Sequence, residues 1–156
     1  AISYSFIRLP SSSFMVPSLP PVRLFLDANV IFSAALGGES FTQLWSMRTA
    51  GLATFCTSPQ CVDEARRNLT LKKPHALARL ESLFLDIELV DPAPAALPWA
   101  EGKLPEDDAW VVAAAVGCGA DVLLTGNTRH FGWMMTRDDL PLRVRTVRVW
   151  LEGLTC

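Results

Sequence analysis

Short apolar runs alternate along this chain with segments whose apolar residues recur every three or four positions. The runs are typical of buried β-strands, and the recurring positions are typical of helices that pack on one side. We expect strands at residues 22–26, 53–57, 88–90, 121–125 and 144–150. Helices are expected from 30 to 36, from about 40 to 50, from 59 and from 74 onward, and from 106 to 118. Strands separated by helices predict an α/β fold, a three-layer α/β/α sandwich around a central parallel sheet.

The first strand is the clearest element. Its five residues, VRLFL, are interrupted only by Arg23, and the run ends abruptly at Asp27. Because ligands bind at the carboxyl ends of strands in parallel sheets, a carboxylate at this place is a candidate functional group. Asn29 follows and is expected to cap the helix that begins at Val30. The segment 131–135, FGWMM, is expected to form a polar turn in which Trp133 is a candidate exposed partner contact.

Length and composition indicate one folded domain. The chain has 156 residues, of which 50% are hydrophobic and 19% charged. We expect residues 21–156 to form this domain and residues 1–20, rich in Ser and Pro, to be a disordered or additional tail. The part before Met15 is expected to be a start-site extension. A net charge of -2 argues against a surface built entirely to hold nucleic acid, but it permits a local basic patch.

Cysteine usage and hydropathy indicate a cytoplasmic protein. The four cysteines form no C-x-x-C pair, so neither a zinc site nor a disulfide framework is expected. No apolar run approaches the roughly 18 to 20 residues that a membrane span needs. The first twenty residues also lack the basic start and continuous apolar stretch of a secretory signal.

Acidic and amide side chains recur at predicted strand ends and helix starts. Asp27 follows the first strand, Asp108 opens a buried helix beside Asp107, and Asn127 follows the fourth strand. Glu64 lies on the third helix, at the edge of its apolar stripe. If the first and fourth strands are neighbours, these groups meet at one edge of the sheet. Close carboxylates repel one another unless a cation compensates them, so the pattern favours Mg²⁺ or Mn²⁺ and hydrolysis of a phosphodiester.

Each of these residues also has an ordinary structural explanation. Asp27, Thr125 and Asn127 are common turn residues. Asp107 and Asp108 suit the positive end of a helix dipole, with Asp107 or Glu106 as a cap, and Asp63 rather than Glu64 could be the inward acid. The basic residues of the third helix can form a solvated face or attract RNA. They are Arg66, Arg67, Lys72 and Lys73. His130 is expected to be a surface or structural residue.

Four motifs in order resemble the PIN domains, a family of small metal-dependent ribonucleases. They are FLDANVIFSA, SPQCVDEARRNL, PEDDAWVVAAA and ADVLLTGNTRHF, and the resemblance runs from about residue 22 to 150. It implies an α/β/α sandwich, a divalent-metal site of Asp27, Glu64 and Asp108, and RNA as substrate. Many small bacterial members are toxins of toxin–antitoxin pairs, which implies an antitoxin partner and a homodimer. The candidate substrate-binding residues are Asn29, Thr125, Arg66 and Arg67.

This chain has Asn127 where many PIN domains have a fourth Asp. An amide oxygen can still hold a metal or a water, so we count Asn127 with the three acids as a catalytic and metal-binding candidate. It carries no charge, however, and should weaken binding of a second cation. The alternative function is therefore a PIN-like domain that binds RNA or protein without cutting. An aspartate-based phosphotransfer domain fits less well, because Asn29 stands where such domains have a second acid.

Overall fold

The computed structural model describes residues 5–8, 15–18, 20–91 and 97–154. Its strands are β1 (Ser5–Arg8), β2 (Met15–Ser18), β3 (Val22–Leu26), β4 (Ala53–Thr57), β5 (Ile87–Leu89), β6 (Val122–Leu124) and β7 (Arg143–Arg145). Its helices are α1 (Ala28–Leu36), α2 (Glu39–Thr49), α3 (Pro59–Lys72), α4 (Leu77–Phe84), α5 (Glu106–Gly117), α6 (Thr128–Met135) and α7 (Val147–Gly153). Short 3₁₀ turns lie at Pro74–Ala76 and Pro98–Ala100.

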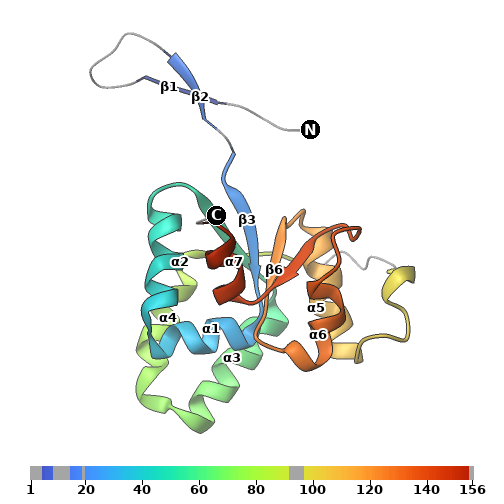
Figure 1. Cartoon of the computed structure of the whole chain (residues 1–156). Helices are drawn as coiled ribbons and strands as arrows, with labels where there is room; N and C mark the ends of the chain where they lie inside the picture. Colours follow the sequence, from blue (N-terminus) through green and yellow to red (C-terminus); the bar gives the residue numbers. More distant parts are fainter. Residues whose placement is uncertain (1–4, 9–14, 19, 92–96, 155–156) are drawn as a thin grey trace.

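A five-stranded parallel sheet in the order β5-β4-β3-β6-β7 forms the centre of the molecule. The chain builds outward from β3 to β4 and β5, and then crosses back to add β6 and β7 on the other side. In Figure 1, β3 runs down the middle, with α1 to α4 on the left and α5 and α6 on the right. The strand order therefore reverses between β3 and β6, which is where open α/β sheets place their ligand sites.

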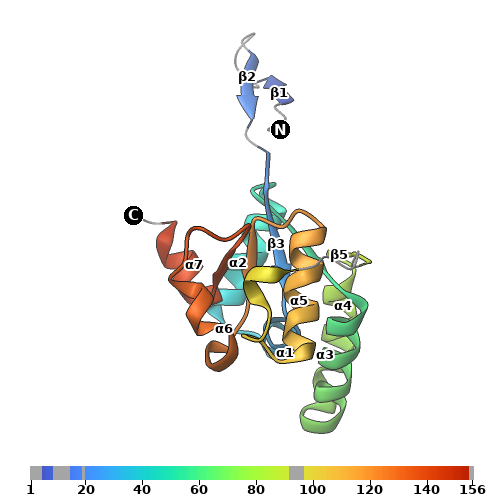
Figure 2. The same ribbon diagram turned by 90° about the vertical axis from the view of Figure 1, so that its right-hand side faces the viewer.

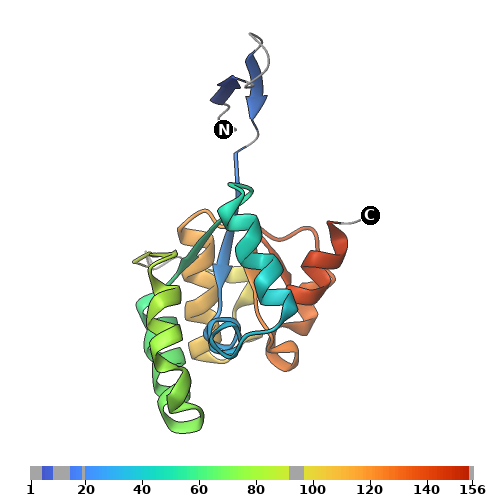
Figure 3. The same cartoon turned by 90° about the vertical axis from the view of Figure 1, so that its left-hand side faces the viewer.

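Helices cover both faces of this sheet. Seen from the two sides, α5 lies in front of β3 in Figure 2, and α2 lies in front of it in Figure 3. Helix α7 packs beside α2. The predicted α/β/α sandwich with a central parallel sheet is confirmed.

The middle of the sandwich is fully apolar. Leu24, Phe25 and Leu26 of β3 have no exposed surface, and Leu123 and Leu124 of β6 have none either. Each such side chain stabilises the fold by about 1.5–3 kcal/mol through its burial. The predicted burial of α5 is confirmed, because its residues 111–115 are all buried. On the other face, the Trp45 ring meets Phe55 edge-on with 4.6 Å between ring centroids.

The predicted strand at 144–150 is wrong. The chain forms only β7 there, and then turns into α7. The Thr146 hydroxyl accepts a hydrogen bond from the Val149 N–H and caps the helix. The sequence V-R-V-W alternates like a strand, but it is too short for its period to distinguish a strand from a helix.

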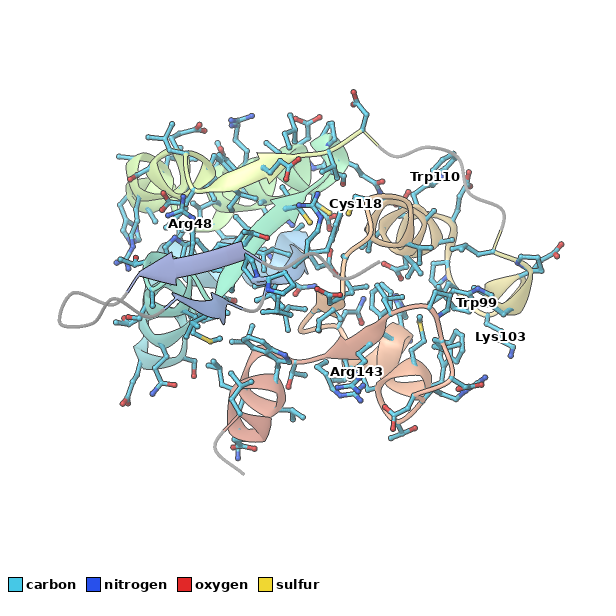
Figure 4. All side chains as sticks on the ribbon, turned by 90° about the horizontal axis from the view of Figure 1, so that it is seen from above. Arg48, Trp99, Lys103, Trp110, Cys118 and Arg143 are labelled. Atoms are coloured by element: carbon cyan, nitrogen blue, oxygen red, sulfur yellow. The ribbon has the colours of Figure 1, made fainter. Side chains whose placement is uncertain are left out.

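The predicted polar turn at 131–135 is also wrong, because these residues belong to α6. Phe131 and Met134, three positions apart, are buried as a helix requires. Trp133 is half-buried, with the Lys103 ammonium 5.1 Å from its ring centroid. Figure 4, seen from above, shows Lys103 and Trp99 on the segment beside α5 and α6.

Other predicted boundaries differ by a few residues. Helix α1 begins at Ala28 rather than Val30, so Asp27 and not Asn29 is its cap. The strands predicted at 88–90 and 121–125 are Ile87–Leu89 and Val122–Leu124. In the predicted tail, β1 and β2 pair antiparallel, and the remainder of residues 1–19 lies outside the described residues.

Disulfide bonds and membrane-spanning helices, neither of which is expected from the sequence, are considered for the described residues only. The thiols of Cys56, Cys61 and Cys118 are all free, although the sulfurs of Cys56 and Cys118 lie 3.7 Å apart. Within residues 5–8, 15–18, 20–91 and 97–154, no helix has the length and hydropathy that crossing a bilayer requires.

Candidate active site

Asp27 lies at the carboxyl end of β3 and is only 5% exposed. Its Oδ1 accepts a 2.7 Å hydrogen bond from the Ala28 N–H, which caps α1. Its Oδ2 accepts 2.7 Å and 3.1 Å bonds from the Thr125 hydroxyl and the Asn29 amide. Burial nevertheless raises the pKa of Asp27, with a smaller contribution from the charge of Asp108. Asp27 is thus a fixed, buried carboxyl group that lies within reach of a second acidic charge.

Thr125 and Asn29 join the end of β6 to the start of α1. The fully buried Thr125 hydroxyl accepts hydrogen bonds from the Asn29 amide at 3.3 Å and the Asn127 N–H at 3.1 Å. The Asn29 Oδ1 accepts a 2.7 Å bond from the Gly126 N–H. A Cβ atom on Gly126 would stand 3.3 Å from that oxygen, so glycine leaves room for the close approach. Thr125 and Asn29 therefore position Asp27 and the loop after β6.

Glu64 is the inward acid of α3. It is half-buried, whereas Asp63 is exposed. Burial raises the pKa of Glu64, and the nearby charge of Asp27 raises it further. The charge of Arg67 acts in the opposite direction, which places this guanidinium near the site. The structure thus brings Glu64 into electrostatic contact with Asp27, as the sequence interpretation preferred.

Asp108 comes from the first turn of α5. Its side chain is 18% exposed, and its Oδ2 lies 2.6 Å from Nδ1 of His130. Asp107 is exposed, and its backbone carbonyl accepts a hydrogen bond from the Gln60 amide. The expected cap at Glu106 or Asp107 is wrong: Pro105 occupies the cap position and no side chain caps the helix. The charge of Asp108 raises the pKa of both Asp27 and Glu64, whereas that of Asp107 raises the pKa of Glu64 and is not among the causes of the shift at Asp27.

Asn127 caps α6. Its Oδ1 accepts a 3.2 Å hydrogen bond from the His130 N–H, and its Nδ2 lies 3.1 Å from Nδ1 of His130. His130 therefore stands between Asn127 and Asp108. Sequence reasoning missed this role because it did not predict α6, and only a helix brings the third residue after Asn127 back to the site. The spacing of Phe131 and Met134 was the available signal.

The two arginines proposed for substrate binding lie in different places. Arg66 donates two hydrogen bonds to Glu81 on α4, at 2.7 and 3.0 Å, and lies over the Phe84 ring. It faces α4 rather than the carboxylates. Arg67 is exposed and is the cation whose charge reaches Glu64.

The donor set suits a hard divalent cation. Asp27, Glu64 and Asp108 supply carboxylate oxygens. Burial raises the pKa of the first two, and the charges of the neighbouring acids add a smaller increase that a cation would relieve. In the described ranges, no group of three or more His, Cys, Asp or Glu side chains is arranged so that it could hold a metal ion. Mg²⁺ commonly binds through only one or two carboxylates and keeps several waters, so it does not require three such side chains already in place.

Comparison with known proteins shows the family of this chain. A family model described as a PIN domain matches residues 23–129, which include all four site positions. The chain belongs to the PIN-domain family. A search of curated proteins finds no match.

Three solved structures share the fold of this PIN domain. VapBC-1 from nontypeable Haemophilus influenzae contains a chain that is 16% identical, with a TM-score of 0.58, and the match covers 81% of this PIN domain chain and 99% of that one. A chain of VapBC2 from Rickettsia felis, bound to a DNA fragment from its promoter, is 17% identical with a TM-score of 0.60, and the match covers 80% of this chain and 98% of that one. A chain of DNA-bound VapBC from Salmonella typhimurium is 19% identical with a TM-score of 0.59, and the match covers 81% of this chain and 98% of that one. At these identities the likeness concerns the fold of the PIN domain alone.

Proposed function

We propose that this PIN domain is a divalent-metal-dependent endoribonuclease. The observation that carries the proposal is the convergence of Asp27, Glu64 and Asp108 from the end of β3, from α3 and from α5, where burial and, to a smaller extent, the neighbouring acidic charges raise the pKa values of Asp27 and Glu64. Structural acids are normally separated or paired with cations. Carboxylates gathered at a topological switch point are arranged to hold a cation and, through it, a phosphate.

Each residue then has a definite task. Asp27, Glu64 and Asp108 would hold Mg²⁺ or Mn²⁺, with the free lone pair of the Asn127 amide oxygen in support. Thr125 and Asn29 keep the Asp27 carboxyl group in one orientation, and His130 does the same for Asp108. The bound ion supplies an activated water and neutralises charge on the phosphate. Hydrolysis of the bond between phosphorus and the ribose 3′ oxygen, with hydroxide added to phosphorus and a proton to the leaving oxygen, would leave a 5′-phosphate and a 3′-hydroxyl.

The physiological setting that we propose is a cytoplasmic toxin–antitoxin pair. The shared fold with chains of three VapBC structures supports this setting. The partners are then an RNA substrate, a cognate antitoxin and a second copy of this chain. Copurification of the chain with the product of a neighbouring reading frame tests the antitoxin, and sedimentation of the purified protein tests the homodimer.

A second candidate function is binding of RNA or protein without cleavage. The observation that favours it is Asn127, which replaces a negative charge and uses its oxygen to cap α6. Under this hypothesis, divalent ions bind weakly and do not affect RNA affinity.

One experiment distinguishes the two. The purified protein is incubated with a pool of single-stranded RNAs, with and without Mn²⁺, beside Asp27→Asn and Asn127→Asp variants. Cleavage that needs Mn²⁺ and disappears in Asp27→Asn supports the nuclease. Cleavage by Asn127→Asp alone, or RNA binding that is indifferent to Mn²⁺, supports the binder.

A matched pair of variants on α3 tests the assignment of Glu64. Glu64→Ala should lose cleavage, whereas Asp63→Ala, which removes the exposed neighbouring acid, should keep it. Equal activity in the two variants would contradict the role of Glu64.

A further inference from the structure

A pocket of about 500 Å³ lies directly beside the carboxylate site. Three of its lining residues, Asn29, Gly126 and Asn127, belong to the network that positions Asp27. The others come from the helices on one face of the sheet: Val30 and Ser33 of α1, Phe41 of α2 and Val147 of α7. Its volume lies in the range of small-molecule sites. Any occupant of this pocket is therefore in contact with the candidate active site.

The lining is uncharged. Val30 and Val147 are buried apolar walls, and Phe41 is a half-buried aromatic side chain at the N-terminal end of α2. Polar groups lie among them in small number, as the Ser33 hydroxyl and the amides of Asn29 and Asn127. Within the described residues the Ser33 hydroxyl has no hydrogen-bond partner, so it is free for an occupant. An uncharged pocket of this kind suits neither a phosphate nor a charged side chain.

We propose that this pocket receives one unpaired nucleobase of the RNA substrate, from a nucleotide next to the phosphate at the carboxylates. The proposal rests on the ribonuclease function proposed above. Unpaired bases are recognised by stacking on aromatic side chains and by hydrogen bonds to their edges. Phe41 supplies an aromatic ring, and the Ser33 hydroxyl supplies both a donor and an acceptor.

The continuity of the pocket with the carboxylates favours RNA over a protein side chain. Thr125 holds Asp27, and the very next residue, Gly126, lines the pocket. Because adjacent Cα atoms are only 3.8 Å apart, a single RNA strand can place a phosphate at the carboxylates and a neighbouring base in the pocket. The enzyme would then prefer particular bases at one position beside the cut.

Abasic substrates test this proposal. A series of RNA oligonucleotides of one cleaved sequence carries a single abasic nucleotide at each position around the cut. With the wild-type protein, kcat/KM should fall roughly 5- to 150-fold at one position, the range that stacking of a base provides. Binding is measured in parallel as fluorescence anisotropy with the non-cleaving Asp27→Asn protein.

A filled pocket should remove this effect. Ser33→Phe places a ring in the pocket from α1, so the intact RNA should bind more weakly. An abasic nucleotide at the sensitive position should then cause no further fall in kcat/KM. Ser82→Phe, at an exposed position of α4, is the matched control and should behave like the wild type. Phe41→Leu keeps an apolar wall without the aromatic face and should reduce the abasic effect. It provides a second test in case Ser33→Phe does not fold.

The outcomes separate this proposal from the proposed function. Cleavage without any position-specific abasic effect, or an effect that persists in both pocket variants, overturns the base site and leaves the nuclease intact. If Ser33→Phe loses binding to a partner protein but binds RNA as the wild type does, the pocket is a protein-binding site, and the proposed base site is overturned as well. Failure of the wild-type protein to bind or cut any RNA overturns both proposals together.

Discussion

The Thr125 hydroxyl donates a 2.7 Å hydrogen bond to Oδ2 of Asp27, across 98 positions of the chain. Both side chains are buried, and the bond joins the ends of the neighbouring strands β3 and β6. Because it lies beneath the carboxylate site, it links the stability of the sheet to the geometry of its most buried acid.

Replacement of Thr125 by Val should therefore destabilise the protein. The isosteric methyl group fills the space but leaves Oδ2 of Asp27 without its shortest partner, which costs about 1–3 kcal/mol for a buried acceptor. Thr125→Ser keeps the hydroxyl and is the control. Urea denaturation measures both free energies of unfolding, and a Val variant as stable as the Ser variant would show that the bond contributes little.

The stability of the metal-free protein should fall as the pH rises above the ordinary carboxyl pKa values of about 4. Burial raises the pKa of Asp27 and of Glu64, so in this range the folded state binds more protons than the unfolded state. The free energy of unfolding consequently decreases from about pH 4 upward, until the raised pKa values are passed. Glu64 contributes less than Asp27, because it is more exposed and better screened.

Thermal unfolding in a chelator, from pH 4 to 8, measures this slope. Asp27→Asn should flatten it, because the largest source of the proton difference is gone, and Mn²⁺ should raise the unfolding temperature of the wild type at neutral pH. A slope that is unchanged in Asp27→Asn would place its origin elsewhere.

His130 should matter for metal binding although it is not a proposed ligand. Its 2.6 Å contact holds Oδ2 of Asp108, and removal of such a supporting group typically weakens metal affinity about 10- to 100-fold. We expect this loss in His130→Ala, measured as the Kd for Mn²⁺ by electron paramagnetic resonance. The other histidine, the exposed His75, provides the control His75→Ala. Equal Kd values in the two variants would reduce His130 to a structural contact.

Arg67 and Arg66 should differ in their effect on RNA binding. Arg67 is exposed and close enough to Glu64 for its charge to oppose the rise in the pKa of that acid, whereas Arg66 is hydrogen-bonded to Glu81. Arg67→Ala should weaken binding to all sequences and reduce the slope of log K against log salt by about 1, as loss of one phosphate contact does. Arg66→Ala should leave that slope unchanged. If instead Arg66→Ala reduced the salt slope and Arg67→Ala did not, the RNA would be expected to run along α4.

The sequence predicted the elements whose signals were local and redundant. The first strand was correct to the residue, because five mostly apolar positions end at an aspartate that is also a helix cap. Helix α3 was equally clear, since Ser58 and Pro59 are start signals and Ala65 and Leu69 keep the helical spacing. The same helical spacing placed Glu64 at the edge of the apolar stripe, facing inward, and Asp63 outward.

The remainder depended on partners far along the chain. Helix α6 has only eight residues and contains a glycine, so its own propensity is weak and its burial against β7 defines it. The contact of His130 with Asp108 required that helix. Nothing local distinguished Arg66 from Arg67, because the difference is Glu81, fifteen positions away on another helix.

The placement of β6 between β3 and β7 divides the chemistry between the two halves of the polypeptide. Asp27 and Glu64 precede β5, and Asp108 and Asn127 come after it. A fragment that stops before α5 holds two acids without their counterparts and leaves one edge of β3 unpaired. Neither half holds all four residues of the candidate site, so we expect a chain that ends before α5 to lack the proposed hydrolytic activity.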